Sequence, residues 1–451
     1  MASRHLDRLR DIARHGAAGA APVVERTLTY VPVDHDGLPV DDRHVHGQDN
    51  RRDDTAVGRA QRCTSEHGTC LRIDSVFGAD RSHGRMRVDE CHVVVDVRLD
   101  VLAGRQVTHA AAGHRVVYVD LETTGLSGGA GTVPFLVGTG EWTPAGFVTT
   151  QFLLPGYASE RAMLHAVNAH LAGAAMIVTF NGRTFDVPVM EMRGEFHRIP
   201  QDVCTLPHLD MLPAARRLWR IGEAGDRSCR LTHLEESVLG FGRVGDVPGF
   251  EIPGRYFSFV RGGGGELLEP VLLHNRLDLL SLAALTARAQ RLLESARHEP
   301  PCTTEAWGLG ALFERDGQQE AALRCYRHVV DDRFQPLEAR RMAALALARL
   351  LRRQRQFDAA AEAWQEVLRL GGRPQLLRDA REALAIHHEY RARDLHEAKR
   401  WAEAGVAQAI GSAEREAFGR RLARIARKSA GRVTPDQPLW ADQDGVSNED
   451  S

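Results

Sequence analysis

Hydrophobic positions in the middle of the chain alternate between short β-branched runs and longer stretches with helical spacing. The run 116–119 is β-branched and aromatic, which predicts a buried strand ending at Asp120. Two further predicted strands, 133–142 and 147–154, are joined by the turn sequence Thr-Pro-Ala-Gly, as expected of an antiparallel hairpin. A helix, a strand and two more helices then follow at about 159–171, 175–180, from 184, and 266–295. Strands that first form a meander and then alternate with helices predict an α/β domain, with a sheet of mixed direction and flanking helices.

The residues before this domain carry weaker patterns. Residues 1–60 mix Gly, Ala, Asp, Arg and His without a period, which predicts a disordered N-terminal segment. Residues 61–111 form an accessory segment whose fold is left open, although the alternation over 93–101 predicts an added strand. Further along, Thr232 and Glu235 have the spacing of a capping box and predict a helix start at Thr232.

A different pattern begins after residue 300. Ala322, Ala360 and Ala398 stand 38 residues apart, each early in the second helix of a predicted pair and each followed by a large aromatic residue. This spacing resembles that of tetratricopeptide helix pairs. We therefore expect an all-α domain of tetratricopeptide-like repeats over 303–428, with a plain helical bundle as the alternative. The polar residues 429–451 are expected to form a disordered tail.

Composition narrows the class of protein. The chain has 451 residues, 43% of them hydrophobic and 26% charged, with a net charge of −2, which is typical of globular proteins with more than one domain. Neither a run of ~20 apolar residues nor a signal sequence is evident, so we expect a cytoplasmic protein with no membrane partner. The seven cysteines are odd in number and lack CxxC spacing, which disfavours a disulfide framework. Several histidines lie near three of them without regular ligand spacing, so a structural zinc site is the less favoured alternative.

Two carboxylates end the first predicted strand of the α/β domain. Asp120 and Glu122 are two residues apart, so both side chains emerge from one face of the strand. Carboxylates held together on a buried strand repel each other unless a cation lies between them. Oxygen ligands of this kind suit Mg²⁺ or Mn²⁺.

Three more polar residues interrupt apolar surroundings. Asp186 is expected in the first turn of a helix at a sheet end, where favourable interaction with the helix dipole is an alternative to metal binding. His274 and Asp278 are four residues apart and share one face of a leucine-rich helix. Buried polar groups require partners, and a simple hydrogen bond between these two side chains is the alternative to a catalytic role.

Three segments carry a resemblance to a known family: DLETTGL from Asp120, NGRTFD ending at Asp186, and HNRLD from His274 to Asp278. In this order they resemble the DEDD-type 3′→5′ exonucleases of the ribonuclease H-like superfamily. Within that family they are similar to the YprB-like group, whose nuclease domain is followed by tetratricopeptide-like repeats. The resemblance covers residues 112–298 and implies a ribonuclease H-like fold for this domain.

The resemblance also implies roles for individual residues. Asp120, Glu122, Asp186 and Asp278 match the four metal-binding carboxylates, and His274 matches the position of the general base. The histidine stands at the spacing of the tyrosine subclass. It therefore remains open whether His274 acts as the base, orients the attacking water or only contacts a substrate phosphate.

The same comparison suggests substrate contacts. Thr123, Thr124 and Leu126 match positions that touch the terminal nucleotide, and Asn181 is carried over with them as a substrate-binding residue. A group of arginines could also meet phosphates, with a solvated helix face as the alternative. These arginines are Arg216, Arg217, Arg220, Arg227 and Arg230.

The expected function is phosphodiester hydrolysis that uses two Mg²⁺ or Mn²⁺ ions. The resemblance implies a 3′→5′ exonuclease that acts on DNA ends in repair, with a protein partner, such as a helicase, at the C-terminal repeats. Three alternatives stay open: a scaffold that binds nucleic acid and a partner without cutting, an enzyme that acts on RNA, and an endonuclease.

Overall fold

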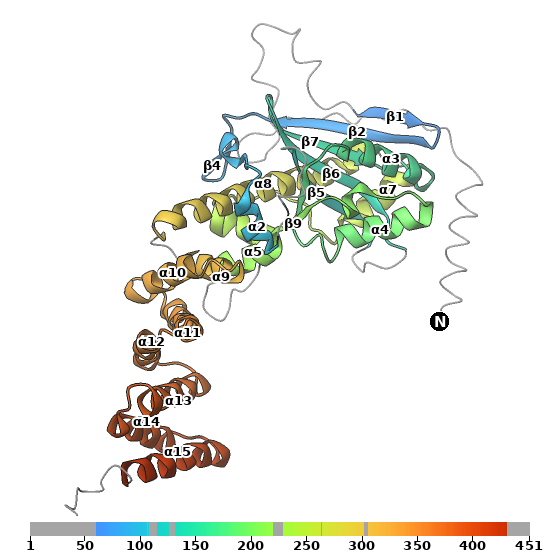
Figure 1. Ribbon diagram of the computed structural model, residues 1–451. Helices are drawn as coiled ribbons and strands as arrows, with labels where there is room; N and C mark the ends of the chain where they lie inside the picture. The colour runs from blue at the N-terminus through green and yellow to red at the C-terminus, as the bar shows by residue number, and fades with distance from the viewer. Residues whose placement is uncertain are drawn as a thin grey trace, which may run out of the picture. The chain divides into compact units, whose positions relative to one another are not determined.

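The computed structural model describes residues 60–105, 107, 115–125, 131–219, 229–262, 264–301 and 305–430 (Figure 1). These residues divide into two compact units, the first ending at Cys325 and the second beginning at Tyr326. The segments predicted to be disordered lie outside the described ranges, apart from Ala60, Ser429 and Ala430, and the last two belong to the final helix.

A seven-stranded sheet forms the centre of the first unit, in the order β1-β2-β7-β6-β5-β8-β9. Strands β1, β2, β7, β6 and β5 pair antiparallel, whereas β5, β8 and β9 pair parallel, which confirms the predicted mixed sheet. The strands are β1 (Gln61–Ser65), β2 (Gly68–Phe77), β5 (Val116–Thr123), β6 (Pro134–Thr143), β7 (Gly146–Leu153), β8 (Met176–Thr179) and β9 (His208–Asp210). A separate two-stranded ribbon consists of β3 (Ser82–His83) and β4 (Met86–Arg87).

The predicted meander and its first crossover are present as β5 to β8. Strand β5 continues past the expected end at Asp120, because its pairing with β6 extends through Glu122, which lies opposite Leu136. The accessory segment before it, whose fold the sequence left open, supplies β1 and β2 to the sheet.

The helices of the first unit flank this sheet (Figure 1). They are α2 (Val97–Ala103), α3 (Glu160–Leu171), α4 (Asp186–His197), α5 (Met211–Leu218), α6 (Leu231–Leu234), α7 (Ile252–Val260), α8 (Glu269–His298) and α9 (Glu305–Arg315). Val117, Val119 and Leu121 of β5 join one hydrophobic core with residues of α3 and α4. Because side chains alternate along a strand, Asp120 and Glu122 project from the opposite face, against which α8 packs.

Two local predictions were wrong. Residues 93–101 do not form a strand, because Asp96 caps α2 by accepting a hydrogen bond from the Arg98 backbone N–H and Gly104 ends the helix in the left-handed conformation. The capping box at Thr232 is not formed either. Helix α6 begins one residue earlier, at Leu231, and passes directly into a π-helical turn, Glu235–Leu239.

The second unit is entirely helical, which confirms the predicted change of class. Its helices are the end of α10 (Gln319–Asp331), α11 (Leu337–Arg353), α12 (Phe357–Leu370), α13 (Pro374–Tyr390), α14 (Leu395–Ala407) and α15 (Ser412–Ala430). Consecutive helices from α11 to α15 pack against one another. Ala360 and Ala398 are buried at the fourth position of α12 and α14, as the 38-residue spacing predicts. The assignment to tetratricopeptide repeats stays a prediction. No helix in the described part of the chain is long and apolar enough to cross a bilayer.

Candidate functional site

The first part of the site is the Asp120 and Glu122 pair on β5, a central strand of the sheet. Asn275 of α8 donates a hydrogen bond from its side-chain Nδ2 to Asp120 Oδ2 at 2.7 Å. His274 Nε2 lies 4.0 Å from Glu122 Oε1. The end of β5 and the middle of α8 therefore meet, although about 155 residues separate them along the chain.

Asp186 reaches the same place from the neighbouring strand β8. The chain leaves β8 at Thr179, turns, and begins α4 at Asp186, whose side chain is buried. Burial raises the pKa of Asp186 to about 7, an effect that the charges of Asp210 and Asp278 reinforce and that backbone N–H groups, including that of Leu121, partly offset. The contact with the Leu121 backbone places the Asp186 carboxyl beside β5, close to Asp120 and Glu122.

Asp278 completes the group of carboxylates. It lies one turn after His274 on α8, and His274 Nε2 is 3.6 Å from Asp278 Oδ2, as expected for positions four residues apart. Burial raises the pKa of Asp120 and of Glu122 well above the usual range, and the charge of Asp278 is the next largest contribution for both. The structure thus brings together the four predicted metal ligands and the predicted base from three separate segments.

Arg243 is a member of this cluster that the sequence did not identify. Its guanidinium donates a hydrogen bond to Asp278 and two to Glu235, at 2.6 and 2.8 Å, and one to Asp246 at 3.1 Å. The side chain is only 5% exposed, and Glu235 only 1%. A buried cation therefore already neutralises part of the negative charge around Asp278.

Asp246 is the second missed residue, and it orients His274. The His274 Nδ1 atom lies 2.8 Å from Asp246 Oδ1. Because an ionised carboxylate only accepts hydrogen bonds, Nδ1 carries the proton in this contact and Nε2 is the basic atom of the neutral ring. Burial acts to lower the pKa of His274, but the hydrogen bond to Asp246 and the charge of Asp278 outweigh it and raise the pKa above its usual value.

The support of Asp120 extends one step further into the protein. Asn275, which is fully buried, accepts a hydrogen bond from Gln151 Nε2 at 2.8 Å while it donates to Asp120. Gln151 in turn donates to the Leu272 carbonyl at 2.9 Å. The amide of Asn275 is therefore held in one orientation, with its N–H group directed at the Asp120 carboxylate.

Asp210 supports the opposite side of the site. Its carboxylate accepts hydrogen bonds from the backbone N–H groups of Asn181, Arg183 and Leu212 at 2.8, 3.2 and 3.0 Å. These bonds shape the turn between β8 and Asp186, where Asn181 adopts a positive φ of 70°. Asp210 thus positions the segment that carries Asp186.

Three of the predicted substrate-binding residues form hydrogen bonds within the protein, and their contact with a substrate stays a prediction. The Thr123 hydroxyl donates to the Gly125 carbonyl at 2.8 Å, and the Thr124 hydroxyl accepts from the Val133 N–H at 3.0 Å. The Asn181 Oδ1 accepts from the Thr184 hydroxyl at 2.8 Å. These contacts stabilise the two loops beside the carboxylates, while Leu126 lies outside the described residues.

The predicted arginine group is only partly described. Arg220 and Arg227 lie outside the described residues, whereas Arg216 and Arg230 are exposed. Arg217 donates to the Pro213 carbonyl at 2.8 Å and so supports its own helix. A role of this group in phosphate binding stays a prediction.

The donor chemistry of the site fits a divalent cation. Four carboxylates converge there, and burial, reinforced by the charges of the neighbouring carboxylates, raises the pKa of Asp120 and of Glu122. In the part of the chain that the structure describes, however, the side chains form no ready-made group of three or more metal ligands. Arg243 is bonded to Asp278 in this arrangement. A cation bound through Asp278 Oδ1 would therefore displace this guanidinium, whereas Oδ2 lies 3.6 Å from His274 Nε2.

Comparison with known proteins agrees with the fold. Residues 117–290 match the model of a family described as the RNase_H superfamily. This segment runs from β5 into α8 and contains all four converging carboxylates. Residues 117–290 of the first unit are thus similar to the RNase H superfamily.

A curated relative extends the similarity beyond this domain. The chain is 29% identical over 367 residues to the uncharacterized protein YprB of Bacillus subtilis (strain 168). The match covers 80% of this chain and 86% of the relative. At 367 residues, the match is longer than residues 117–290 and so extends beyond the family model.

Proposed function

We propose that this protein is a divalent-metal-dependent nuclease, a DEDD-type 3′→5′ exonuclease that hydrolyses phosphodiester bonds at DNA ends. The observation that supports it best is the convergence of Asp120, Glu122, Asp186 and Asp278 from three distant segments at one end of a central strand. A domain of the RNase H-like superfamily suggests nucleic acid as the substrate. The preference for DNA and the 3′→5′ direction rest on the family resemblance.

The protein's own side chains divide the chemical work between them. Asp120, Glu122, Asp186 and Asp278 would hold Mg²⁺ or Mn²⁺, which when bound supplies acidity to water and stabilises charge on the leaving oxygen. His274 accepts the proton of the attacking water at Nε2, while Asp246 fixes the ring and stabilises the charged form that results. Asn275 and Asp210 hold Asp120 and the Asp186 segment in place.

The test is a hydrolysis assay with the purified full chain. Matched DNA and RNA oligonucleotides, labelled at either end, are incubated with Mg²⁺, with Mn²⁺ or with EDTA. We expect stepwise shortening from the 3′ end that stops in EDTA. Asp120→Ala should reduce the rate roughly 100-fold or more, in the range found when an electrostatic stabiliser of a transition state is removed. Wild-type activity in Asp120→Ala would refute the assignment.

A matched control and a substrate control make the result specific. Glu191→Gln removes an exposed carboxylate from α4, the helix that begins with Asp186, and should leave the rate unchanged. A circular single strand has no end, so an exonuclease leaves it whole. Cutting of the circle would instead identify an endonuclease.

A non-cleaving nucleic-acid-binding scaffold is the second candidate, and one observation favours it. Arg243 already bonds to Asp278, and the described residues form no ready-made metal cluster. If the site only binds nucleic acid, oligonucleotides would bind with or without metal and no product would form. Product release that requires Mg²⁺ or Mn²⁺ excludes this candidate.

On the family resemblance alone, we also propose a role in DNA repair with a protein partner, such as a helicase, at the C-terminal repeats. Co-purification from cells treated with a DNA-damaging agent would test it. A helicase recovered with the full chain, but not with a chain cut before Tyr326, would support this role.

A further inference from the structure

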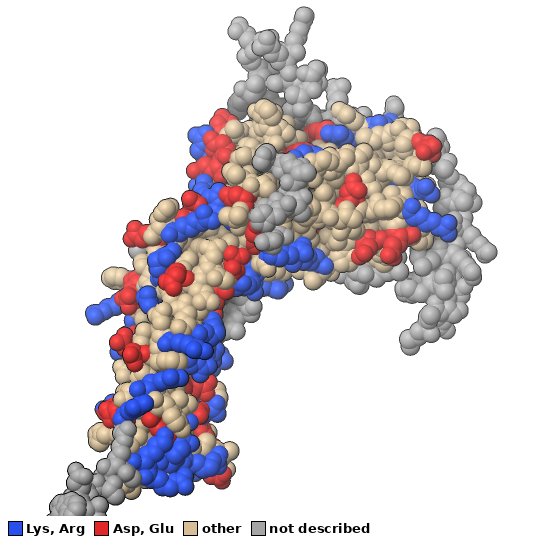
Figure 2. Space-filling model, in the orientation of Figure 1, with Lys and Arg blue, Asp and Glu red and all other residues tan. Residues whose placement is uncertain are grey.

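The second unit differs from the rest of the chain in its charge. Between Tyr326 and Ala430 the sequence has 22 lysine and arginine residues and 14 aspartate and glutamate residues, a formal net charge of +8. The whole chain has a net charge of −2, so the remainder is acidic. On the face shown in Figure 2, basic side chains gather over the helices of the second unit. A field of this sign attracts polyanions over distances comparable to the Debye length.

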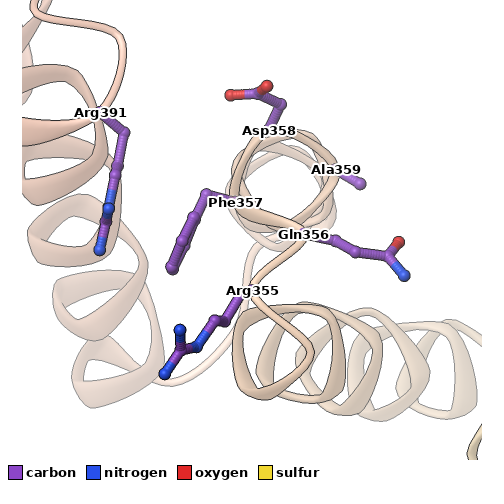
Figure 3. A pocket seen from close by; sticks show the side chains of 6 residues that line it. All are labelled: Arg355, Gln356, Phe357, Asp358, Ala359 and Arg391. Atoms are coloured by element: carbon purple, nitrogen blue, oxygen red, sulfur yellow. The ribbon is translucent and has the colours of Figure 1, made fainter.

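A pocket in this unit concentrates the basic charge. It has a volume of about 460 Å³ and is lined by residues of the α11–α12 turn and by Arg391 at the end of α13. In Figure 3 the side chains of Arg355, Phe357 and Arg391 converge on one space between the helices. Asp358, the one acidic residue among the lining residues, points away from Arg355. The pocket thus presents two guanidinium groups and an aromatic ring.

The two arginines are available to a ligand. The Arg391 guanidinium carbon lies 4.0 Å from the centre of the Phe357 ring, and both Arg355 and Arg391 are exposed to solvent. Within the described residues, neither the Arg355 nor the Arg391 side chain has a carboxylate partner or a hydrogen bond. Planar guanidinium groups with free N–H edges are suited to bind phosphate oxygens in pairs.

The backbone of the same turns places these arginines at the surface. Arg355 and Arg393 both adopt the left-handed conformation, with φ of 60° and 55°, in the α11–α12 and α13–α14 turns. They are 38 residues apart, the spacing of the repeated alanines, and Gly317 has a φ of 81° at the same spacing before Arg355. Glycine suits this conformation best, whereas these two turns use arginine. The repeat therefore has a left-handed residue at each of these corresponding turns, and in two of them this residue is an exposed arginine.

We propose that the pocket formed by Arg355, Phe357 and Arg391 binds a backbone phosphate of single-stranded nucleic acid, and that the second unit is a nucleic-acid-binding surface. The choice of nucleic acid rests in part on the proposed function, since a nuclease would gain a second grip on its substrate. An acidic protein segment fits the pocket less well than a phosphodiester chain, because the excess charge extends over the whole unit and not over one groove.

The test measures binding and does not require cleavage. Fluorescence anisotropy of a labelled single-stranded oligonucleotide is recorded with the full chain in EDTA, over a series of salt concentrations. Arg355→Gln/Arg391→Gln should weaken binding roughly tenfold, as expected when charge-assisted hydrogen bonds are lost. The slope of log K against log salt should fall by about 0.7 for each phosphate contact removed.

A matched double variant separates the pocket from general charge. Arg349→Gln/Arg427→Gln removes the same charge from exposed positions of α11 and α15, and should change affinity much less. Equal loss in both double variants, or loss in neither, would overturn the proposal. The proposal would also be overturned if binding of an acidic peptide required Arg355 and Arg391 while binding of the oligonucleotide did not. Arg355→Gln alone, which leaves the Arg391 and Phe357 stack intact, repeats the test should the double variant misfold.

The result is independent of the catalytic assignment. The binding assay is made in EDTA and needs no cleavage. Absence of hydrolysis by the wild-type chain in Mg²⁺ and in Mn²⁺ would therefore refute the proposed nuclease while leaving the binding difference intact. Conversely, if the chain is an active nuclease but its affinity for the oligonucleotide does not change when Arg355 and Arg391 are substituted, only the inference about the second unit is overturned.

Discussion

The guanidinium of Arg243, in the segment between Leu239 and α7, donates a hydrogen bond to the carboxylate of Asp278 on α8, a residue that we propose binds metal. The same guanidinium binds Glu235, which is almost fully buried. In this arrangement Arg243 supplies positive charge to one of the four converging carboxylates. A divalent cation at the site and Arg243 would then compete for Asp278.

Substitution of Arg243 tests this competition. We expect Arg243→Gln to destabilise the metal-free protein by about 3 kcal/mol, because Glu235 would keep a buried charge without its partner. Mn²⁺ should then stabilise the variant more than it stabilises the wild type, since Asp278 is free to bind it. Thermal unfolding in EDTA and in Mn²⁺ measures both effects. Glu235→Gln/Arg243→Gln, which removes the stranded charge as well, is the control. An equal Mn²⁺ shift in variant and wild type would contradict the competition.

Gly138 on β6 tests the support of Asp120. A Cβ atom at this position would lie 2.0 Å from Asn275 Oδ1, so Gly138→Ala must displace the amide that donates to Asp120. We expect a loss of about 2 kcal/mol in the free energy of unfolding, as is usual for overpacking, and a loss of nuclease activity.

A double variant separates the two effects of this substitution. Asn275→Ala in the Gly138→Ala background removes the clash and should restore part of the stability, but not the activity. Gly254→Ala, where the added atom meets nothing within 4 Å, is the control. Full activity in Gly138→Ala would show that Asn275 does not position Asp120.

We expect His83 to make the free energy of unfolding depend on pH. Its ring is buried, lies 4.1 Å from the Phe241 ring, and has Nε2 2.8 Å from Ser281 Oγ. Burial, with the charges of Arg243 and Arg81, lowers the pKa of His83 from 6.5 to about 3. The unfolded chain therefore binds a proton that the folded chain does not. The stability that the neutral His83 ring contributes is complete above pH 6.5. It is lost as the pH falls toward 3, by at most about 1.4 kcal/mol per pH unit.

The measurement is urea unfolding of the wild type and of His83→Gln at pH 7 and at pH 5. Glutamine can keep a hydrogen bond to Ser281 but does not titrate, so the variant should lose less stability between the two pH values. Parallel losses in both proteins would assign the acid sensitivity to other groups.

We expect Glu389 to stabilise the helical unit through its ion pairs. Its side chain is fully buried and binds Arg421, Arg424 and Lys428 at 3.2, 2.7 and 2.8 Å. Burial acts to raise its pKa, but the hydrogen bonds from Arg424 and Lys428 outweigh it and lower the pKa to about 2. Glu389→Gln should destabilise the packing of α13 against α15 by about 3 kcal/mol, because three cations lose their counter-charge.

Hydrogen exchange of α13 and α15 measures this change locally. Glu382→Gln is the control, since Glu382 is 48% exposed and pairs with Arg421 at 3.3 Å, so its loss should cost under about 0.5 kcal/mol. Unchanged protection of both helices in Glu389→Gln would contradict a structural role for this cluster.

Much of the architecture could be predicted from local pattern. β-branched runs identified four strands of the sheet, and helical periodicity placed α3, α8 and the helices of the second unit. At 93–101 a short alternating pattern suits more than one element, and at Thr232 the helix start was right to within one residue although the predicted cap does not form. There the hydrogen bonds at the helix ends, as at Asp96, decided the outcome.

The sequence by itself determined which residues could share a face. Asp120 and Glu122 are paired by the two-residue period of a strand, and His274 and Asp278 by the helical repeat, because these periods belong to the backbone. It also placed Asp186 at a helix start. Such relations need only a few consecutive residues.

Only the tertiary structure decided which distant groups meet. Arg243 lies 35 residues from Asp278, Asp246 lies 28 from His274, and Gln151 lies 124 from Asn275. The periods of strands and helices, about two and 3.6 residues, relate only neighbouring positions and do not span such separations. These partners are selected by the cost of leaving a charged or polar group buried without a hydrogen bond, and that cost exists only once the sheet and α8 have packed together.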